Sequence, residues 1–178
     1  MPGSLALRRG VLALLISLAA SGPANAFTSG VWTGGPDRDE AGRFLDCTMT
    51  AQSQAGILIA FVVSRDFDWG LALADERWTL PIGEVHDIQL KIDSLAPMKA
   101  IAKMIDAHGM LVPLEKGNLA VEALRRAKLL TIDAPAGKFS FTLDGTGEAF
   151  DALGKCVREN LAEERASEGT GDTRDASP

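Results

Sequence analysis

Histidine and cysteine are scarce in this sequence, and tyrosine is absent. The 178 residues contain two histidines, His86 and His108, and two cysteines. Imidazole chemistry is therefore limited to two candidates. The sequence also has no HExxH, CxxC, EF-hand or GxSxG motif, which would mark a zinc, redox, calcium or serine-hydrolase site. These absences predict a protein without a metal or organic cofactor and favour a non-catalytic function.

Long apolar runs are also missing. The longest, residues 10–20, has about 11 residues, whereas a bilayer-spanning helix needs roughly 20. Arg8 and Arg9 precede this run, and residues 24–26 (ANA) supply the small side chains of a cleavage site. We interpret residues 1–26 as a signal peptide and expect a periplasmic or secreted protein with no membrane span after cleavage. An uncleaved membrane anchor is the competing interpretation.

Basic residues are in deficit. The chain has 18 lysines and arginines against 24 acidic residues, and its formal charge is −6. Residues 1–26 contain two arginines and no acid, so their removal leaves an even more acidic chain. A surface of this sign repels phosphate backbones and anionic headgroups, which disfavours nucleic acid as a partner.

The two cysteines, Cys47 and Cys156, lie near the two ends of the expected exported chain. In an oxidising compartment such a pair most often forms one disulfide. Closing so long a loop would stabilise the fold by roughly 4 to 5 kcal/mol in the loop-closure model. The alternative is two separate thiols acting as a nucleophile or a redox pair.

Most of the chain has the pattern of short strands. Residues 85–93 (VHDIQLKID) alternate apolar and polar side chains, as expected of a strand with one buried face. Residues 97–107 fit either a strand or a helix, and we favour the strand. Turn residues separate the runs at hairpin spacing, which predicts antiparallel pairing. The remaining strands are expected at 45–51, 56–64, 69–74, 78–82, 129–134 and 138–143.

Two helices are expected, one over residues 118–128 with Asn118 as its cap and one after residues 144–147. The apolar face of the second helix consists of Phe150, Leu153, Val157 and Leu161, and Cys156 lies beside it. The fold class is therefore α+β. We expect an antiparallel sheet or small sandwich covered by two helices, with the C-terminal helix disulfide-linked to the first strand.

The chain divides into four parts on composition. The signal peptide is followed by an N-terminal loop over residues 27–43, which is rich in glycine, proline and charge and is anchored by Trp32. A single α+β domain then spans residues 44–162. Residues 163–178 are polar and lack large apolar side chains, which predicts a disordered tail.

Few residues stand out as candidates for a site. Trp69 and Trp78 flank an expected strand and could form an aromatic surface that binds carbohydrate or peptide, although tryptophan also closes the edge of small cores. His86 lies on the polar side of a strand. His108, in an expected turn, has Asp106 nearby in the sequence. We predict no catalytic residue and no metal ligand.

The order of the elements is familiar from one family. A strand ending in Asp93 and a helix near residues 119–127 are followed by residues 139–146 (FSFTLDGT), which lead into 148–153 (EAFDAL). This order resembles small exported proteobacterial proteins of the invasion-associated locus B type, in which an FxLxG strand precedes an Ala-x-x-Leu helix. The resemblance implies a non-enzymatic envelope or host-contact protein.

Three hypotheses for function follow. The first is an exported, non-catalytic binding or interaction protein of the bacterial cell envelope, which recognises an unknown protein or envelope component through its hairpin ends or an exposed sheet edge. The second is a small periplasmic hydrolase that uses His108 with a carboxylate such as Asp106. The third is a subunit or inhibitor of a larger exported enzyme.

Overall fold

The structure is a computed structural model, which describes residues 26–114 and 119–171. The expected signal peptide before residue 26, the expected cap Asn118 and residues 172–178 lie outside the described residues.

Antiparallel strands are the most numerous elements of the described chain. They form one ten-stranded sheet in the order β1-β2-β3-β4-β5-β8-β7-β6-β9-β10. The strands are β1 (Phe27–Ser29), β2 (Trp32–Arg38), β3 (Phe44–Gln52), β4 (Leu58–Ser64), β5 (Trp69–Ala74), β6 (Val85–Ile92), β7 (Met98–Met104), β8 (Gly109–Leu114), β9 (Leu129–Ala134) and β10 (Gly137–Thr142). The expected antiparallel sheet is thus confirmed.

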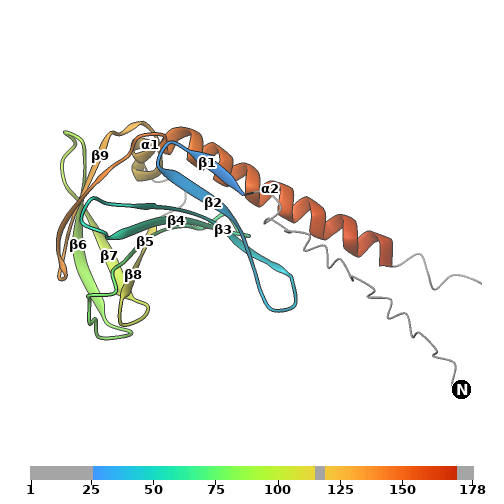
Figure 1. Ribbon diagram of the computed structural model, residues 1–178, viewed down its shortest axis with the longest axis horizontal. Helices are drawn as coiled ribbons and strands as arrows, with labels where there is room; N and C mark the ends of the chain where they lie inside the picture. Colours follow the sequence, from blue (N-terminus) through green and yellow to red (C-terminus); the bar gives the residue numbers. More distant parts are fainter. Residues whose placement is uncertain (1–25, 115–118, 172–178) are drawn as a thin grey trace, which may run out of the picture.

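The sheet bends where β8 meets β7, because these strands pair through only two residue pairs. Figure 1 shows β6, β7 and β9 running across the direction of β3 and β4. We call β1–β5 with β8 the first half, and β6, β7, β9 and β10 the second half. The two halves face each other, and the side that each turns to the other is the inner face.

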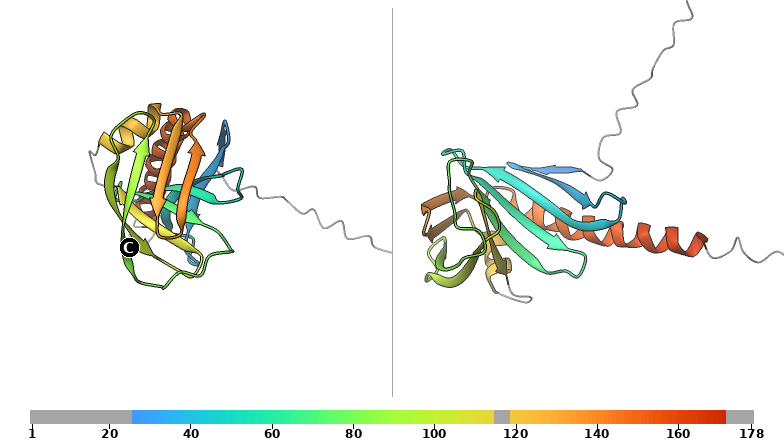
Figure 2. Two further views of the ribbon diagram at one scale, coloured as in Figure 1. Left: turned by 90° about the vertical axis from the view of Figure 1, so that its left-hand side faces the viewer. Right: turned by 90° about the horizontal axis from the view of Figure 1, so that it is seen from below.

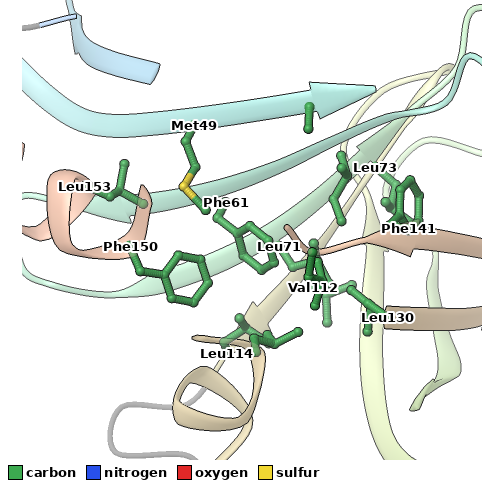
Figure 3. Close-up of a cluster of buried hydrophobic side chains, with 14 of the residues drawn as sticks. Met49, Phe61, Leu71, Leu73, Val112, Leu114, Leu130, Phe141, Phe150 and Leu153 are labelled. Carbon is green, nitrogen blue, oxygen red and sulfur yellow. The ribbon is translucent and has the colours of Figure 1, made fainter. Parts of the chain in front are cut away.

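The core lies between these inner faces. Alternate residues of each strand point inward, as the pleat of a strand requires, and they are almost fully buried. Figure 3 shows side chains of both halves meeting there. They include Met49, Phe61, Leu71, Leu73, Val112, Leu114, Leu130 and Phe141.

The two helices have different roles. The long helix α2 (Thr146–Gly171) packs against β1–β4 and places Phe150 with its ring centroid 4.9 Å from that of Phe61. Leu153 and Val157 are fully buried, as the expected apolar face requires. The short helix α1 (Leu119–Arg126) packs chiefly on α2. One helix therefore covers the sheet, and the second supports that helix.

A disulfide joins Cys47 to Cys156, with 6.2 Å between the two Cα atoms. The predicted pairing is confirmed in the structure, and it fits a chain that folds in an oxidising compartment. The bond links α2 to β3, which is the third strand and not the first. The reason is that a hairpin precedes β3 in the chain.

The expected N-terminal loop over residues 27–43 is wrong for most of its length, since β1 and β2 form this hairpin. The Phe27 ring lies over Gly34, which leaves room for it because it has no side chain. Pro36 is tolerated because β1 pairs only with residues 32–34, so β2 has a single neighbour at Pro36. Trp32 is fully buried, in agreement with its expected role as an anchor.

Two other boundaries also differ from expectation. Residues 78–82 form a loop and not a strand, because the Trp78 amide closes a turn onto the Asp75 carbonyl at 3.0 Å. The expected tail from residue 163 is helical as far as Gly171. Glu163 and Glu164 hold this part of α2 to the sheet through ion pairs with Arg38 and Arg65.

Candidate binding surface

The outer face of the first half is largely apolar, although no element of the described residues covers it. Helix α2 and the second half both lie on the inner side, where Phe61 and Cys47 point. Apart from Asp46 and Gln52 at the two ends of β3, the outward side chains of β3, β4, β5 and β8 are small, apolar or hydroxyl-bearing. They are Thr48, Thr50, Leu58, Ala60, Val62, Gly70, Ala72, Ala74, Leu111 and Pro113. We call this set the outer face.

The cross-strand register places these residues side by side. One row runs Thr50, Ala60, Ala72 and Leu111 across four neighbouring strands. The next row runs Thr48, Val62, Gly70 and Pro113. The outer face is therefore a continuous surface and not a scatter of single apolar residues.

The second half has a different outward face. Its outward positions include Asp87, Gln89, Lys91, Lys99 and Lys103, all of them exposed. This mixture is typical of a sheet face in contact with water. The two halves belong to one sheet, so the apolar character of the outer face is a local property of β3, β4, β5 and β8.

A hollow of about 640 Å³ adjoins the outer face at Leu58 and Ala74. Its other walls bring polar groups, including Glu76, Arg77 and His108. Binding sites commonly combine apolar walls with a few polar groups that orient the ligand. The hollow and the outer face together have this composition.

Arg77 shapes the hollow through two contacts. Its guanidinium donates to the Ala55 carbonyl at 2.9 Å and to both carboxylate oxygens of Asp75. These side-chain hydrogen bonds lower the pKa of Asp75 to about 2. Asp75 therefore stays ionised at neutral pH and holds Arg77 in place between the β3–β4 turn and the segment after β5.

The His108 ring is bound to the backbone. Its Nδ1 donates to the Trp78 carbonyl at 2.8 Å, which fixes the proton on that nitrogen because a carbonyl can only accept. Asp106 accepts the His108 backbone amide at 2.7 Å and does not bind the ring. The imidazole–carboxylate pair that the hydrolase hypothesis requires is therefore not formed in this structure.

The other histidine lies apart from this surface. His86 is on β6, where its Nε2 lies 3.0 Å from Oε2 of Glu84. It belongs to the second half and does not contribute to the hollow. Among the residues that the structure describes, no group of three or more histidine, cysteine or acidic side chains could hold a metal ion.

The structure separates the two tryptophans of the expected aromatic surface. Trp69 begins β5 and packs on Phe150 of α2, with 5.0 Å between ring centroids. Trp78 follows the other end of β5 and packs on Phe139 of β10 at 5.4 Å. Both are partly buried against the core, so each closes one edge of it.

Two carboxylates face each other at one end of the outer face. Asp46 of β3 pairs with Asp37 of β2 in the strand register. Burial raises the pKa of Asp46, the hydrogen bond from Thr48 lowers it, and the Asp37 carboxylate raises it. A positively charged group placed here would relieve the repulsion between the two carboxylates.

The sequence contained a signal for the outer face, although the candidates above did not include it. Residues 56–64 (GILIAFVVS) are apolar at odd and even positions alike. Such a run is typical of a strand that is buried on both faces. Here the inner face of β4 is buried, whereas on its outer face Ala60 is buried and Leu58 and Val62 remain accessible to solvent.

Among the described residues, no helix is both long and apolar enough to cross a bilayer. The fold and the disulfide define the class of this molecule as a disulfide-bonded antiparallel sheet covered by one long helix.

No protein-family model and no curated protein sequence matches this chain. Among solved structures, the chain is similar to invasion associated protein B from Bartonella henselae, with a TM-score of 0.54 and 20% sequence identity. The match covers 75% of this chain and 97% of that one. The resemblance to invasion-associated B proteins is therefore confirmed at the level of the fold.

Proposed function

We propose that this protein is an exported, non-catalytic interaction protein of the bacterial cell envelope, which binds a protein partner through the outer face. The observation that carries the proposal is the contrast between the two halves of one sheet. The central outward positions of β3, β4, β5 and β8 are uncharged and mostly small or apolar, while those of β6 and β7 include three lysines and an aspartate beside the exposed Val85 and Ile101. Contiguous exposed apolar surface on a folded chain marks interaction sites.

The chemistry of the surface restricts the partner. The centre of the outer face would be covered by an apolar patch of the partner, as at the core of protein–protein interfaces. At one edge, the Asp37 and Asp46 pair favours a lysine or arginine of the partner. At the other, the hollow offers Arg77 and His108 as polar contacts that fix orientation.

Export is part of the proposal. The buried disulfide supports it, because such bonds persist in oxidising compartments. The N-terminal sequence supports it independently, through its pattern of arginines, a short apolar run and small residues.

The proposal is tested by charge substitution on the two outward surfaces. Leu111→Glu and Leu58→Glu each place a carboxylate on the outer face. Ile101→Glu is the matched control, because Ile101 is 56% exposed and points outward from β7 in the second half. The tagged exported chain, with each substitution, is used to capture partners from the envelope fraction of its own cells.

We expect both outer-face variants to reduce capture of the partner by about tenfold or more, which corresponds to about 1.4 kcal/mol of binding free energy. Ile101→Glu should leave capture unchanged. Unfolding midpoints that match the parent protein would show that all three variants fold. Equal loss in all three folded variants, or undiminished capture by Leu111→Glu and Leu58→Glu, would contradict the proposal.

A further inference from the structure

Strand β10 lies at one end of the sheet, so among the described strands it has a neighbour on one side only. It pairs with β9 through six consecutive residues. One position beyond β10, the Leu143 amide donates to the Lys128 carbonyl at 2.8 Å. This bond shows which residues of β10 hydrogen-bond to β9, because backbone groups alternate between the two sides of an antiparallel strand.

Three residues of β10 consequently direct their backbone groups to the open side. Phe139 and Phe141 are two and four residues before Leu143, so their backbone groups also point toward β9. The backbone groups of Lys138, Ser140 and Thr142 point away from β9. Each of these three presents an N–H donor and a C=O acceptor outward. All three residues are exposed.

The two edges of the sheet are not equally protected. At the far edge, β1 has three residues and contacts α2, so little of its backbone is open. Strand β10 has six residues and no proline, and its pairing with β9 has no register shift. Its only charged residue, Lys138, is paired with Asp133. Natural edge strands are usually blocked by shortness, proline, bulges or charge.

A cleft of about 560 Å³ lies along this open edge. Its near side is β10, and its far side is the end of the β3–β4 hairpin, including Ala51, Ile57 and Ile59. Val31 and Leu129 also line it, and they are 55% and 45% exposed. Figure 2 (left) shows the orange strands β9 and β10 at this end of the molecule. The cleft therefore offers backbone partners along β10 and exposed apolar side chains at Val31 and Leu129.

We propose that this cleft binds an extended peptide segment of another protein, which pairs with β10 as an additional strand. The peptide backbone would bond to residues 138, 140 and 142, and every second side chain would turn toward the end of the β3–β4 hairpin. Those inward positions should be uncharged, because Lys138 is the only charged residue among the described residues that line the cleft. The proposal does not depend on the outer face, since the residues of β10 form no part of it.

A second copy of this chain could also pair edge to edge at β10, but the cleft favours a peptide. The cleft lies between β10 and the end of the β3–β4 hairpin, so a second sheet edge would have to enter between them, whereas a single extended segment is narrower. The acidic net charge of the chain further opposes self-association.

The test uses a short synthetic peptide in which valine and threonine alternate, flanked by lysines for solubility. A second peptide of the same sequence carries N-methyl groups at alternate residues, which removes the donors that β10 would need and keeps the side chains. Amide hydrogen exchange of the exported chain is followed by NMR with each peptide at millimolar concentration. Two variants complete the design: Ser140→Pro removes one outward N–H, and Ser140→Ala retains it.

We expect the first peptide to slow exchange of the Ser140 and Thr142 amides by about tenfold or more. The Phe139 and Phe141 amides, which already bond to β9, should change little. The N-methylated peptide should have no effect, and Ser140→Pro should weaken peptide binding while Ser140→Ala does not. Unchanged exchange at Ser140 and Thr142, or equal protection by both peptides, would overturn the proposal. So would protection that rises with protein concentration alone, because it would show that β10 pairs with a second copy.

Discussion

The disulfide gives the sharpest prediction about stability. Cys47→Ala combined with Cys156→Ala removes the bond and leaves the remaining contacts between β3 and α2. Because the bond closes a loop with a sequence separation of 109, the loop-closure model predicts a loss of roughly 4 to 5 kcal/mol in the free energy of unfolding. Typical domains have a total of only about 5–15 kcal/mol, so the variant should be close to unfolding.

The two sulfur atoms also pack in the core, since Cys47 and Cys156 are 0% and 3% exposed. Reduction of the parent protein separates these contributions, because it breaks the bond and keeps both sulfur atoms in place. Urea unfolding of the oxidised, reduced and double-alanine proteins measures the free energy of each. The reduced form should lose most of the predicted stability, and the alanine variant somewhat more.

In the loop-closure model, the bond acts mainly by restricting the unfolded chain. The dependence of the unfolding free energy on urea should then be steeper without the bond, because the free chain exposes more surface. A loss below about 1 kcal/mol on reduction, with an unchanged slope, would refute the loop-closure argument for this protein.

Three further predictions concern single residues. Gly34→Ala should lower the free energy of unfolding by about 1–3 kcal/mol, because the added Cβ would lie 2.6 Å from the Thr48 carbonyl oxygen. Gly35→Ala is the control, because its added Cβ meets no atom closer than 3.5 Å, and it should be neutral in the same thermal unfolding assay. Asp46→Asn should raise stability at pH 7 by roughly 0.2–1 kcal/mol, the scale of one cross-strand pair. Folding raises the pKa of the Asp46 carboxyl, so its ionised form destabilises the folded protein. The gain should therefore vanish in acid, where the carboxyl is protonated. Asp75 has a folded-state pKa of about 2, below the ordinary 3.8, so its contribution is present above pH 4 and is lost as the pH falls toward 2. Asp75→Asn should lower stability at pH 7 and reduce the loss of stability between pH 4 and pH 2. Urea unfolding at several pH values measures this loss, and an unchanged loss in the variant would contradict the role given to Asp75.

Local patterns in the sequence predicted the strands well where polar and apolar residues alternate or where turns are clear. Residues 85–93 and the hairpin around residues 135–137 are examples, and β6, β9 and β10 lie close to the expected ranges. The disulfide could be predicted because the chain offers a single pairing of two cysteines. These features depend on neighbouring residues or on composition alone.

Features that depend on distant contacts could not be predicted in this way. Residues 32–38 have the composition of a loop, and their strand forms because β3 pairs with them and Phe27 packs over Gly34. Residues 163–171 lack an apolar face, and ion pairs such as Arg38 with Glu163 hold the helix there. The pairing of β5 with β8 is equally non-local.

The candidate site needed both the register and the bend of the sheet. The sequence showed that residues 56–64 are apolar throughout, but it did not show that one side of this strand would remain uncovered. The tryptophans were more conspicuous in the sequence, yet each is explained by one aromatic contact at an edge of the core. Exposed apolar residues became informative only when the strand order placed them side by side.

Photo-crosslinking in intact cells tests binding at the outer face most directly. Benzoylphenylalanine is introduced at Val62, on the outer face, or at Lys99, on the outward side of β7. The account predicts a discrete crosslinked protein adduct from position 62 and none from position 99. An adduct of equal yield from position 99, or no adduct from position 62 in a folded and exported chain, would contradict it.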